Sequence, residues 1–331
     1  MREAAVNSCK TPRASIRNPR SPIRNPLSTH HQPRSAPKST PDKPLYGAAR
    51  KDRKLTPHVV RRDDLAPGHT RFACTVAYDG TDYVGWQSQP DGKAVQDVIE
   101  ARLARVFRKP IRIHGSGRTD SGVHADGQVF HFDVEWKHPK EILLKALHAD
   151  MPADILIKDI RVAKPNFHAR FSARGKRYVY RIRLGFSPPD RARFEWALGS
   201  RPVNVEAMQE AAKRLVGVHD FTAFGGMHKQ GMERENPVKD LRRLDVVRKG
   251  DLVVVTTEAG GYLYKMVRRL VGGLVQVGLG RMTPDRLIAY RDELRISAEV
   301  PTAPARGLTK SKVFFGLPKN ANTDAFDDAG E

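Results

Sequence analysis

The hydrophobic pattern of residues 71–317 switches repeatedly between the two-residue period of a strand and the 3.6-residue period of a helix. Residues 71–78 alternate apolar and other side chains, whereas residues 94–108 place apolar side chains at helical spacing. The same criteria predict strands at 111–114, 129–134, 155–162, 178–184, 241–247, 252–258 and 313–315, and helices at 139–149, 204–216, 262–277 and from Thr283 or Asp285 onward. Two stretches of similar size with mixed strands and helices indicate an α+β fold with two related halves rather than a doubly wound sheet. We expect the halves at 71–190 and 191–317.

The first 70 residues do not share this pattern. They contain 15 Lys or Arg against five acids, and ten of the 23 prolines of the chain. Such a segment cannot bury enough apolar surface to offset the entropy of ordering it, so we expect disorder there and in the acidic tail at 318–331. Three interpretations of residues 1–70 stay open: a solvated tail or misassigned start, a basic arm that contacts phosphates, and a cleaved organellar presequence.

The charge of the whole chain is strongly positive, with 58 Lys and Arg against 37 acids and a net charge of +21. A surface of this charge attracts polyanions, nucleic acid first and an anionic membrane surface second. A membrane span is not expected, because three basic residues interrupt the most apolar stretch, 262–280.

Cys9 and Cys74 are the two cysteines, and they form no CxxC motif. This excludes a disulfide scaffold and a cysteine-rich zinc site. It fits a reducing compartment, so we expect a cytoplasmic location.

The densest motif is GSGRTDSGVHADGQ at residues 115–128. It matches neither GxxxxGK[ST] nor GxGxxG, and a strand rather than a helix follows it, so a phosphate-binding loop is disfavoured. Asp120 in a glycine-lined cleft suits a nucleophile or a general base, provided that a nearby cation keeps it charged. Arg118 is one candidate for that cation, or it contacts RNA instead. An aspartate that caps a turn beside an arginine explains the same spacing, and both interpretations stay open.

Other chemistries lack their motifs. No HExxH, no HxE with PCxxC and no GxSxG is present, which argues against a zinc protease, a zinc deaminase and a serine hydrolase. Histidines 124, 131, 168 and 219 are scattered, as buried or surface histidines usually are, so we expect no metal. Aromatic residues mixed with cations at 79–87 and 167–183 suit RNA binding, although Tyr178 and Tyr180 also suit a packed strand.

Several blocks of the chain resemble the tRNA pseudouridine synthase A family. They include AYDGTDYVGWQ (77–87), GSGRTDSGVHADGQVFHF (115–132), FHARFSARGKRYVYRI (167–182), YLYKMVRRLVGGLVQVGLGR (262–281) and APARGL (303–308). The blocks follow the family's order and cover about residues 71–317. The RTDSGVHA block is highly specific for the family.

The resemblance implies a role for five residues. Asp120 corresponds to the nucleophile, Arg118 to the base-flipping arginine, Tyr178 to the tyrosine that stacks on the target base, Arg268 to the arginine paired with the aspartate, and Leu308 to an apolar pocket residue. It also implies two ferredoxin-like halves with mixed, mainly antiparallel sheets, joined across a central basic cleft. The family acts as a homodimer without a cofactor on uridines 38, 39 and 40 of the tRNA anticodon stem-loop.

Some positions depart from the family pattern, and two other functions stay open. Ser121 stands where alanine is usual, and residues 148–150 and 225–237 match poorly. A non-catalytic RNA-binding protein accounts for charge and aromatic residues, but not for the set of Arg118, Asp120 and Tyr178. A pseudouridine synthase for other RNA sites is the second alternative.

Overall fold

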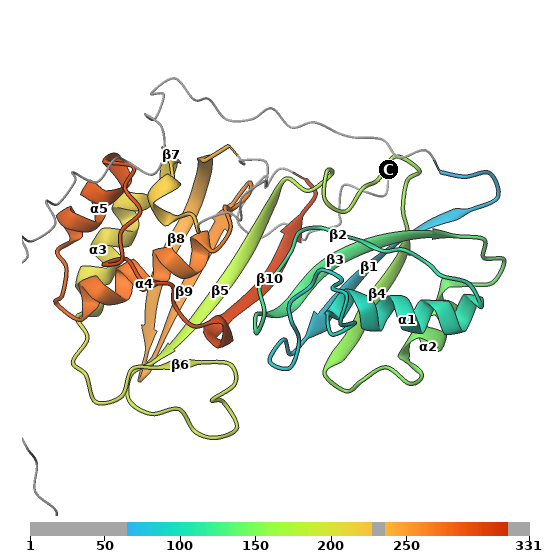
Figure 1. Cartoon of the computed structure of the whole chain (residues 1–331), viewed down its shortest axis with the longest axis horizontal. Helices are drawn as coiled ribbons and strands as arrows, with labels where there is room; N and C mark the ends of the chain where they lie inside the picture. Colours follow the sequence, from blue (N-terminus) through green and yellow to red (C-terminus); the bar gives the residue numbers. More distant parts are fainter. Residues whose placement is uncertain (1–64, 227–235, 317–331) are drawn as a thin grey trace, which may run out of the picture. The chain divides into compact units, whose positions relative to one another are not determined.

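The computed structural model describes residues 65–226 and 236–316 (Figure 1). Its helices are α1 (Val95–Phe107), α2 (Lys140–His148), α3 (Val205–Leu215), α4 (Met266–Gly278) and α5 (Pro284–Asp292), with 3₁₀ turns η1 (Thr222–Phe224) and η2 (Ala305–Gly307). Its strands are β1 (Thr70–Tyr78), β2 (His114–Gly115), β3 (His124–Val134), β4 (Ile155–Val162), β5 (Gly175–Arg183), β6 (Trp196–Ala197), β7 (Gly217–Asp220), β8 (Val238–Lys249), β9 (Leu252–Ala259) and β10 (Leu308–Phe314). The α+β class predicted from the sequence is confirmed.

All strands belong to one mixed sheet with the order β4-β1-β3-β10-β5-β9-β8-β7, to which β2 is added beside β3 and β6 beside β5. Most pairs are antiparallel, while β10 runs parallel to β3 and β6 parallel to β5. The sheet is therefore mainly antiparallel, as expected.

The strand order repeats within the sheet. The first unit places its strands in the order β4-β1-β3-β2, with α1 after β1 and α2 after β3. The second unit places β10-β5-β9-β8 in the same relative order, with α3 after β5 and α4 and α5 after β9. Each unit is thus a split β-α-β arrangement of the ferredoxin type.

The second unit begins with β5, earlier in the chain than the boundary at residue 190 that we expect from the sequence. The alternation of apolar residues shows that β5 is a strand, but only its pairing with β9 and β10 shows which unit it joins. The proline-containing segment near 190 lies inside the second unit, between β5 and α3.

Several predicted boundaries shift. Residues 111–113 lie outside any strand, β3 starts at His124 rather than 129, and α4 starts at Met266 rather than 262. Lys265 explains the last shift, because its left-handed backbone (φ 60°) cannot continue a helix backward. The predicted disorder of residues 1–64 and 318–331 lies outside the described residues, and β1 already includes Thr70.

Two hydrophobic cores lie between the sheet and its helices. Figure 1 shows α1 and α2 together beside the β1 end of the sheet, and α3, α4 and α5 together beside β8 and β9. Ile99 and Leu103 of α1 pack with Phe130 and Phe132 of β3 and are all at most 1% exposed. The second core contains the apolar face of α4 together with buried side chains of β5, β8 and β9. Burial on this scale fixes each helix against its own unit.

The two units meet where β3 and β10 pair in parallel, at His124 with Thr309 and Ala125 with Lys310. The loop that carries the RTDSGVHA motif runs from β2 into the first residue of β3. The fold therefore brings the motif to the join between the two units.

Candidate active site

Asp120 lies in the turn that leads from β2 into β3. The amide of Val123 donates to the carbonyl of Asp120 (3.1 Å), and the amide of Trp86 donates to the carbonyl of Thr119 (3.2 Å). The hydroxyls of Thr119 and Tyr78 share a hydrogen bond of 2.8 Å. Main-chain and side-chain bonds on both sides thus hold the Asp120 backbone in one place.

Arg268 of α4 is the cation beside Asp120. One of its terminal nitrogens donates to Asp120 Oδ2 at 2.8 Å, and its Nε donates to the carbonyl of Ala303 at 2.8 Å. The side chains of Arg268 and Asp120 are 16% and 22% exposed. The pair is thus partly shielded from water but still open to a ligand, and the guanidinium attracts the ionised carboxylate.

Tyr178 of β5 is near enough to Asp120 for the carboxylate to act on it electrostatically. Its side chain is 8% exposed, and its ring packs edge-on against Tyr262, with the centroids 5.2 Å apart. Burial, together with nearby Tyr78 and Asp120, raises the pKa of Tyr178 above its ordinary value. The phenol therefore stays protonated at neutral pH. Only a small part of the ring can contact a ligand, because most of it is buried.

The other two predicted residues lie apart from this contact. Arg118 is exposed, and its Nε donates to the Gln87 side-chain oxygen at 3.2 Å rather than to Asp120. Leu308 begins β10 opposite Tyr180, and it is 5% exposed within the second core. The structure thus brings together Asp120, Arg268 and Tyr178, leaves the Arg118 side chain at the surface, and buries Leu308 in the second core.

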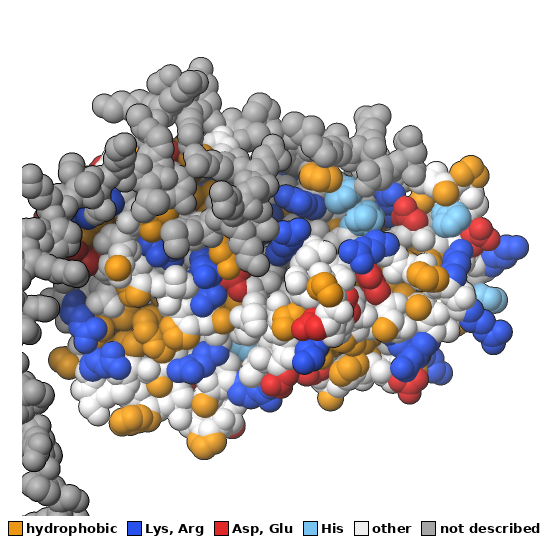
Figure 2. All heavy atoms as spheres, viewed as in Figure 1, with side chains coloured by type: hydrophobic (Ala, Val, Ile, Leu, Met, Phe, Trp, Pro, Cys, Tyr) orange, Lys and Arg blue, Asp and Glu red, His pale blue; other side chains and the backbone are white. Residues whose placement is uncertain are grey.

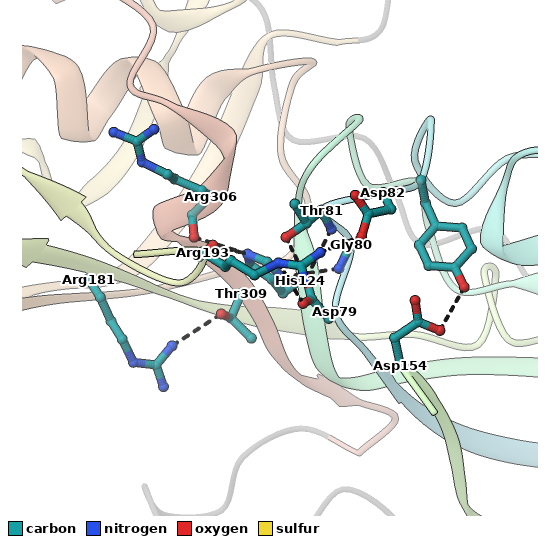
Figure 3. Close-up of polar contacts among 11 residues, drawn as sticks. Asp79, Gly80, Thr81, Asp82, His124, Asp154, Arg181, Arg193, Arg306 and Thr309 are labelled. Atoms are coloured by element: carbon teal, nitrogen blue, oxygen red, sulfur yellow. Dashed lines mark hydrogen bonds and ion pairs between the residues drawn. The ribbon is translucent and has the colours of Figure 1, made fainter. Parts of the chain in front are cut away.

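His124, four residues after Asp120, connects three segments at the join. Its Nε2 lies 3.0 Å from the carbonyl oxygens of both Arg193 and Arg306, so this nitrogen carries the donated proton. Its Nδ1 accepts from the amide of Gly80 at 3.0 Å and lies 3.0 Å from Asp79 Oδ1. Figure 3 shows His124 between Asp79 and Arg193, with Arg306 on the η2 side. This buried ring ties the motif loop to both units.

Lys310 of β10 forms hydrogen bonds with the start of the loop that carries Asp120. It is 0% exposed, and its ammonium donates to Ser116 Oγ (3.3 Å), the carbonyl of Gly117 (3.1 Å) and Gln128 Oε1 (2.5 Å). Burial, and secondarily Lys176, lower its pKa well below the ordinary value. The contacts hold the backbone just before Arg118.

Sequence reasoning missed Tyr262, Lys310 and Asp79 as parts of the site. Tyr262 carried a signal, because it opens the aromatic and basic block that contains Arg268. No sequence signal pointed to Lys310, because a lysine in a strand is expected to be exposed rather than completely buried.

A cavity of about 310 Å³ lies elsewhere, lined by Arg181, Asp190, Arg191, Phe194 and Glu195. None of the five predicted site residues lines it. Across residues 65–226 and 236–316, no group of three or more His, Cys, Asp or Glu side chains could hold a metal ion. In the same ranges, no helix has both the length and the apolar composition needed to cross a bilayer.

Two ferredoxin-like units with a carboxylate held against an arginine at their join are the arrangement that the resemblance to an RNA-modifying isomerase implies. Comparison with known proteins agrees. The family model described as tRNA pseudouridine synthase matches residues 74–172 and 211–316. The chain belongs to the tRNA pseudouridine synthase family.

Individual relatives carry the name tRNA pseudouridine synthase A. One from Rhodospirillum rubrum is 43% identical over 248 residues, which cover 74% of this chain and 87% of the relative. One from Rhizobium meliloti is 43% identical over 251 residues (74% and 99%), and one from Limosilactobacillus fermentum is 38% identical over 260 residues (77% and 99%). A solved Cbf5-Nop10-Gar1 complex matches at 13% identity and a TM-score of 0.26, over 62% of this chain and 45% of that chain, and it carries no weight for the fold.

Proposed function

We propose that this enzyme converts uridines 38, 39 and 40 of the tRNA anticodon stem-loop to pseudouridine, with Asp120 as the nucleophile. The observation that carries the proposal is the 2.8 Å contact between Asp120 and Arg268 beside Tyr178. The positions on the tRNA rest on the family resemblance.

The reaction is an isomerisation, so it needs neither an oxidant nor a second substrate. The N1–C1′ bond of uridine breaks, the uracil turns, and a C5–C1′ bond forms. C5 then loses its proton and N1 ends with one, so the composition of the nucleotide is unchanged. One ionised carboxylate suits attack at C1′, attack at C6 or removal of a proton from C2′.

The target base must leave its stack to reach Asp120, at a cost of a few kcal/mol. Arg118 is exposed and near the carboxylate in sequence, which suits insertion into the space that the base vacates. Tyr178 suits stacking on the extruded uracil, which contributes about 1–3 kcal/mol. The family resemblance assigns Leu308 to the apolar wall of the pocket, and its side chain is 5% exposed.

Positive charge supports tRNA as the substrate. Figure 2 shows Lys and Arg side chains spread over the visible face, with fewer Asp and Glu among them. Such a surface holds phosphates without reading sequence. A homodimer, supported by the resemblance, and a cytoplasmic location, supported by the cysteine content, belong to the same proposal.

The test is to map pseudouridine in tRNA transcripts after incubation with the wild-type protein. Transcripts with uridine at 38, 39 or 40 are compared with transcripts that carry cytidine at these positions. We expect new pseudouridine only at those uridines. Pseudouridine at other positions favours a synthase for other RNA sites, and its complete absence, with tRNA binding intact, favours a non-catalytic RNA-binding protein.

A further inference from the structure

An exposed tyrosine, Tyr264, lies four residues before Arg268 in the sequence. Among the Phe, Tyr and Trp side chains of the described residues, Tyr264 (45% exposed) and Phe186 (79% exposed) are the two that count as exposed. Tyr264 immediately precedes Lys265, which caps the start of α4, and Arg268 lies three residues further on. Arg268, four residues after Tyr264, lies in the first turn of α4, so Tyr264 is close to the Asp120–Arg268 pair along the chain without being part of it.

The backbone at this point is bent in a way that costs energy. Lys265 has φ 60° and ψ 3°, a left-handed conformation that is rare for a residue with a long side chain. Strain of this kind persists only where the surroundings enforce it, and it is concentrated at functional sites. The bend separates Tyr262, which packs on Tyr178, from Tyr264, which reaches solvent.

The Tyr264 ring is held in position from two sides. The Lys265 ammonium lies 5.0 Å from the ring centroid. Gly226 donates its amide to the carbonyl of Tyr264 at 2.7 Å, and a Cβ at Gly226 would lie 2.8 Å from Tyr264 Cδ1. A side chain at position 226 would meet the ring, so glycine lets this backbone approach Tyr264 closely.

Besides Lys265, a second basic residue lies at this end of the sheet. The Arg242 guanidinium donates to the carbonyl of Arg174 at 2.8 Å and approaches Gly260, four residues before Tyr264. The hydroxyl of Tyr262 donates to the main-chain carbonyl of Lys176 at 3.3 Å, which holds Tyr262 against this end of β5. An aromatic ring among cations suits an unpaired nucleotide, since the ring stacks on the base and the cations meet phosphates.

We propose that Tyr264 and Lys265 form a stacking platform for one unpaired nucleotide of the RNA, next to the uridine that reaches Asp120. This inference rests on the proposed function and deepens it, because it places a second, non-reacting base at the site. The platform binds the substrate and the transition state about equally, so its loss acts on KM more than on kcat.

The kinetic test compares Tyr264→Ala with Tyr264→Phe, and uses Phe186→Ala as a matched control. Phe186 follows β5 at the end opposite Lys176, and Arg183 lies seven residues after that lysine along the strand, a distance of about 23 Å. We expect Tyr264→Ala to raise both KM and the Kd for an anticodon stem-loop RNA roughly 10-fold, with a smaller change in kcat. Tyr264→Phe keeps the ring and should stay near wild type, as should Phe186→Ala.

A photocrosslink locates the contact directly. Stem-loop RNAs that carry 5-iodouridine at single loop positions outside the target are irradiated with the wild-type protein, and the crosslinked peptide is identified by mass spectrometry. We expect a crosslink at Tyr264 from one position. Unchanged Kd and KM in Tyr264→Ala, an equal loss in Tyr264→Phe, or crosslinks only at other residues would overturn the platform. These outcomes leave the proposed function standing if wild-type protein still forms pseudouridine in the same RNA.

Discussion

His131 of β3 is a buried histidine that the reaction does not use. It is 1% exposed, and its ring lies 4.6 Å from that of His168 and 5.0 Å from that of His114. Burial first, then His168, His114 and Arg71, lower its pKa to about 3. Its Nδ1 accepts from the amide of Ala169 at 3.2 Å, so the neutral ring is the form that fits.

The lowered pKa makes stability depend on pH. An unfolded histidine takes up its proton near pH 6.5, whereas folded His131 does so near 3, so the unfolded state binds more protons between these values. The contribution is complete above pH 6.5 and is lost as the pH falls toward 3. Between pH 6.5 and 5, we expect the wild type to lose about 2 kcal/mol more unfolding free energy than His131→Gln. Urea unfolding at both pH values checks this, and equal losses in the two proteins would contradict it.

Within the candidate site, spacing alone did not identify the partner of Asp120. Arg118 was the nearest cation in the sequence, but its side chain contacts Gln87, and Arg268 arrives from the other unit. The two residues are 148 positions apart. No local pattern encodes such a contact, and only the family resemblance indicated it.

At the scale of elements, the join depends on where β10 begins. η2 ends at Gly307, and Leu308 follows as the first residue of the strand. A Cβ at Gly307 would lie 2.5 Å from Tyr180 Cε1 and 2.9 Å from the carbonyl oxygen of Arg181. Since the Tyr180 ring is 1% exposed and hydrogen-bonded to Pro304, it has no room to move away.

Gly307→Ala should therefore displace the start of β10. We expect a loss of about 1–3 kcal/mol of unfolding free energy, as for an overpacked core, together with lower activity because Leu308 shifts. Gly261→Ala is the matched control, because nothing lies within 4 Å of its added Cβ. Thermal unfolding of both variants measures the effect, and equal stability would show that η2 adapts.

The hydrophobic period of the sequence predicted the bounds of several long helices and strands well. It did not predict which strands pair with one another. The helix at α1 and the strands β1, β4 and β9 lie within a residue or so of the predicted ranges, because each has a clear apolar face. The two-residue strands β2 and β6 are defined only by their partners. The parallel pairing of β3 with β10 is a tertiary feature, since each residue pattern is compatible with several neighbours.

At the scale of the whole molecule, charge should control affinity for tRNA. Residues 1–64, outside the described part, contain 15 Lys or Arg and five acids, close to half of the net charge of +21. With six or more phosphate contacts, raising salt from about 50 to about 200 mM should weaken binding roughly 10³-fold.

Deleting residues 1–64 separates the interpretations of this segment. The deletion removes none of the residues described in the fold and site, so we expect folding and pseudouridine formation to persist. A shallower dependence of Kd on salt in the shortened protein indicates a phosphate-binding arm, and an unchanged slope indicates a solvated or removed segment. Loss of folding on deletion would contradict this expectation.

The central claim is that the Asp120 carboxylate reacts with the tRNA. The most direct measurement is tritium release from tRNA labelled at C5 of uridine, under single-turnover conditions, with wild type and Asp120→Asn. The amide has nearly the same shape and can still accept from Arg268, so Kd for tRNA and thermal stability should stay close to wild type. We predict that Asp120→Asn slows release by more than about 10³-fold. Release by Asp120→Asn at the wild-type rate would contradict the account.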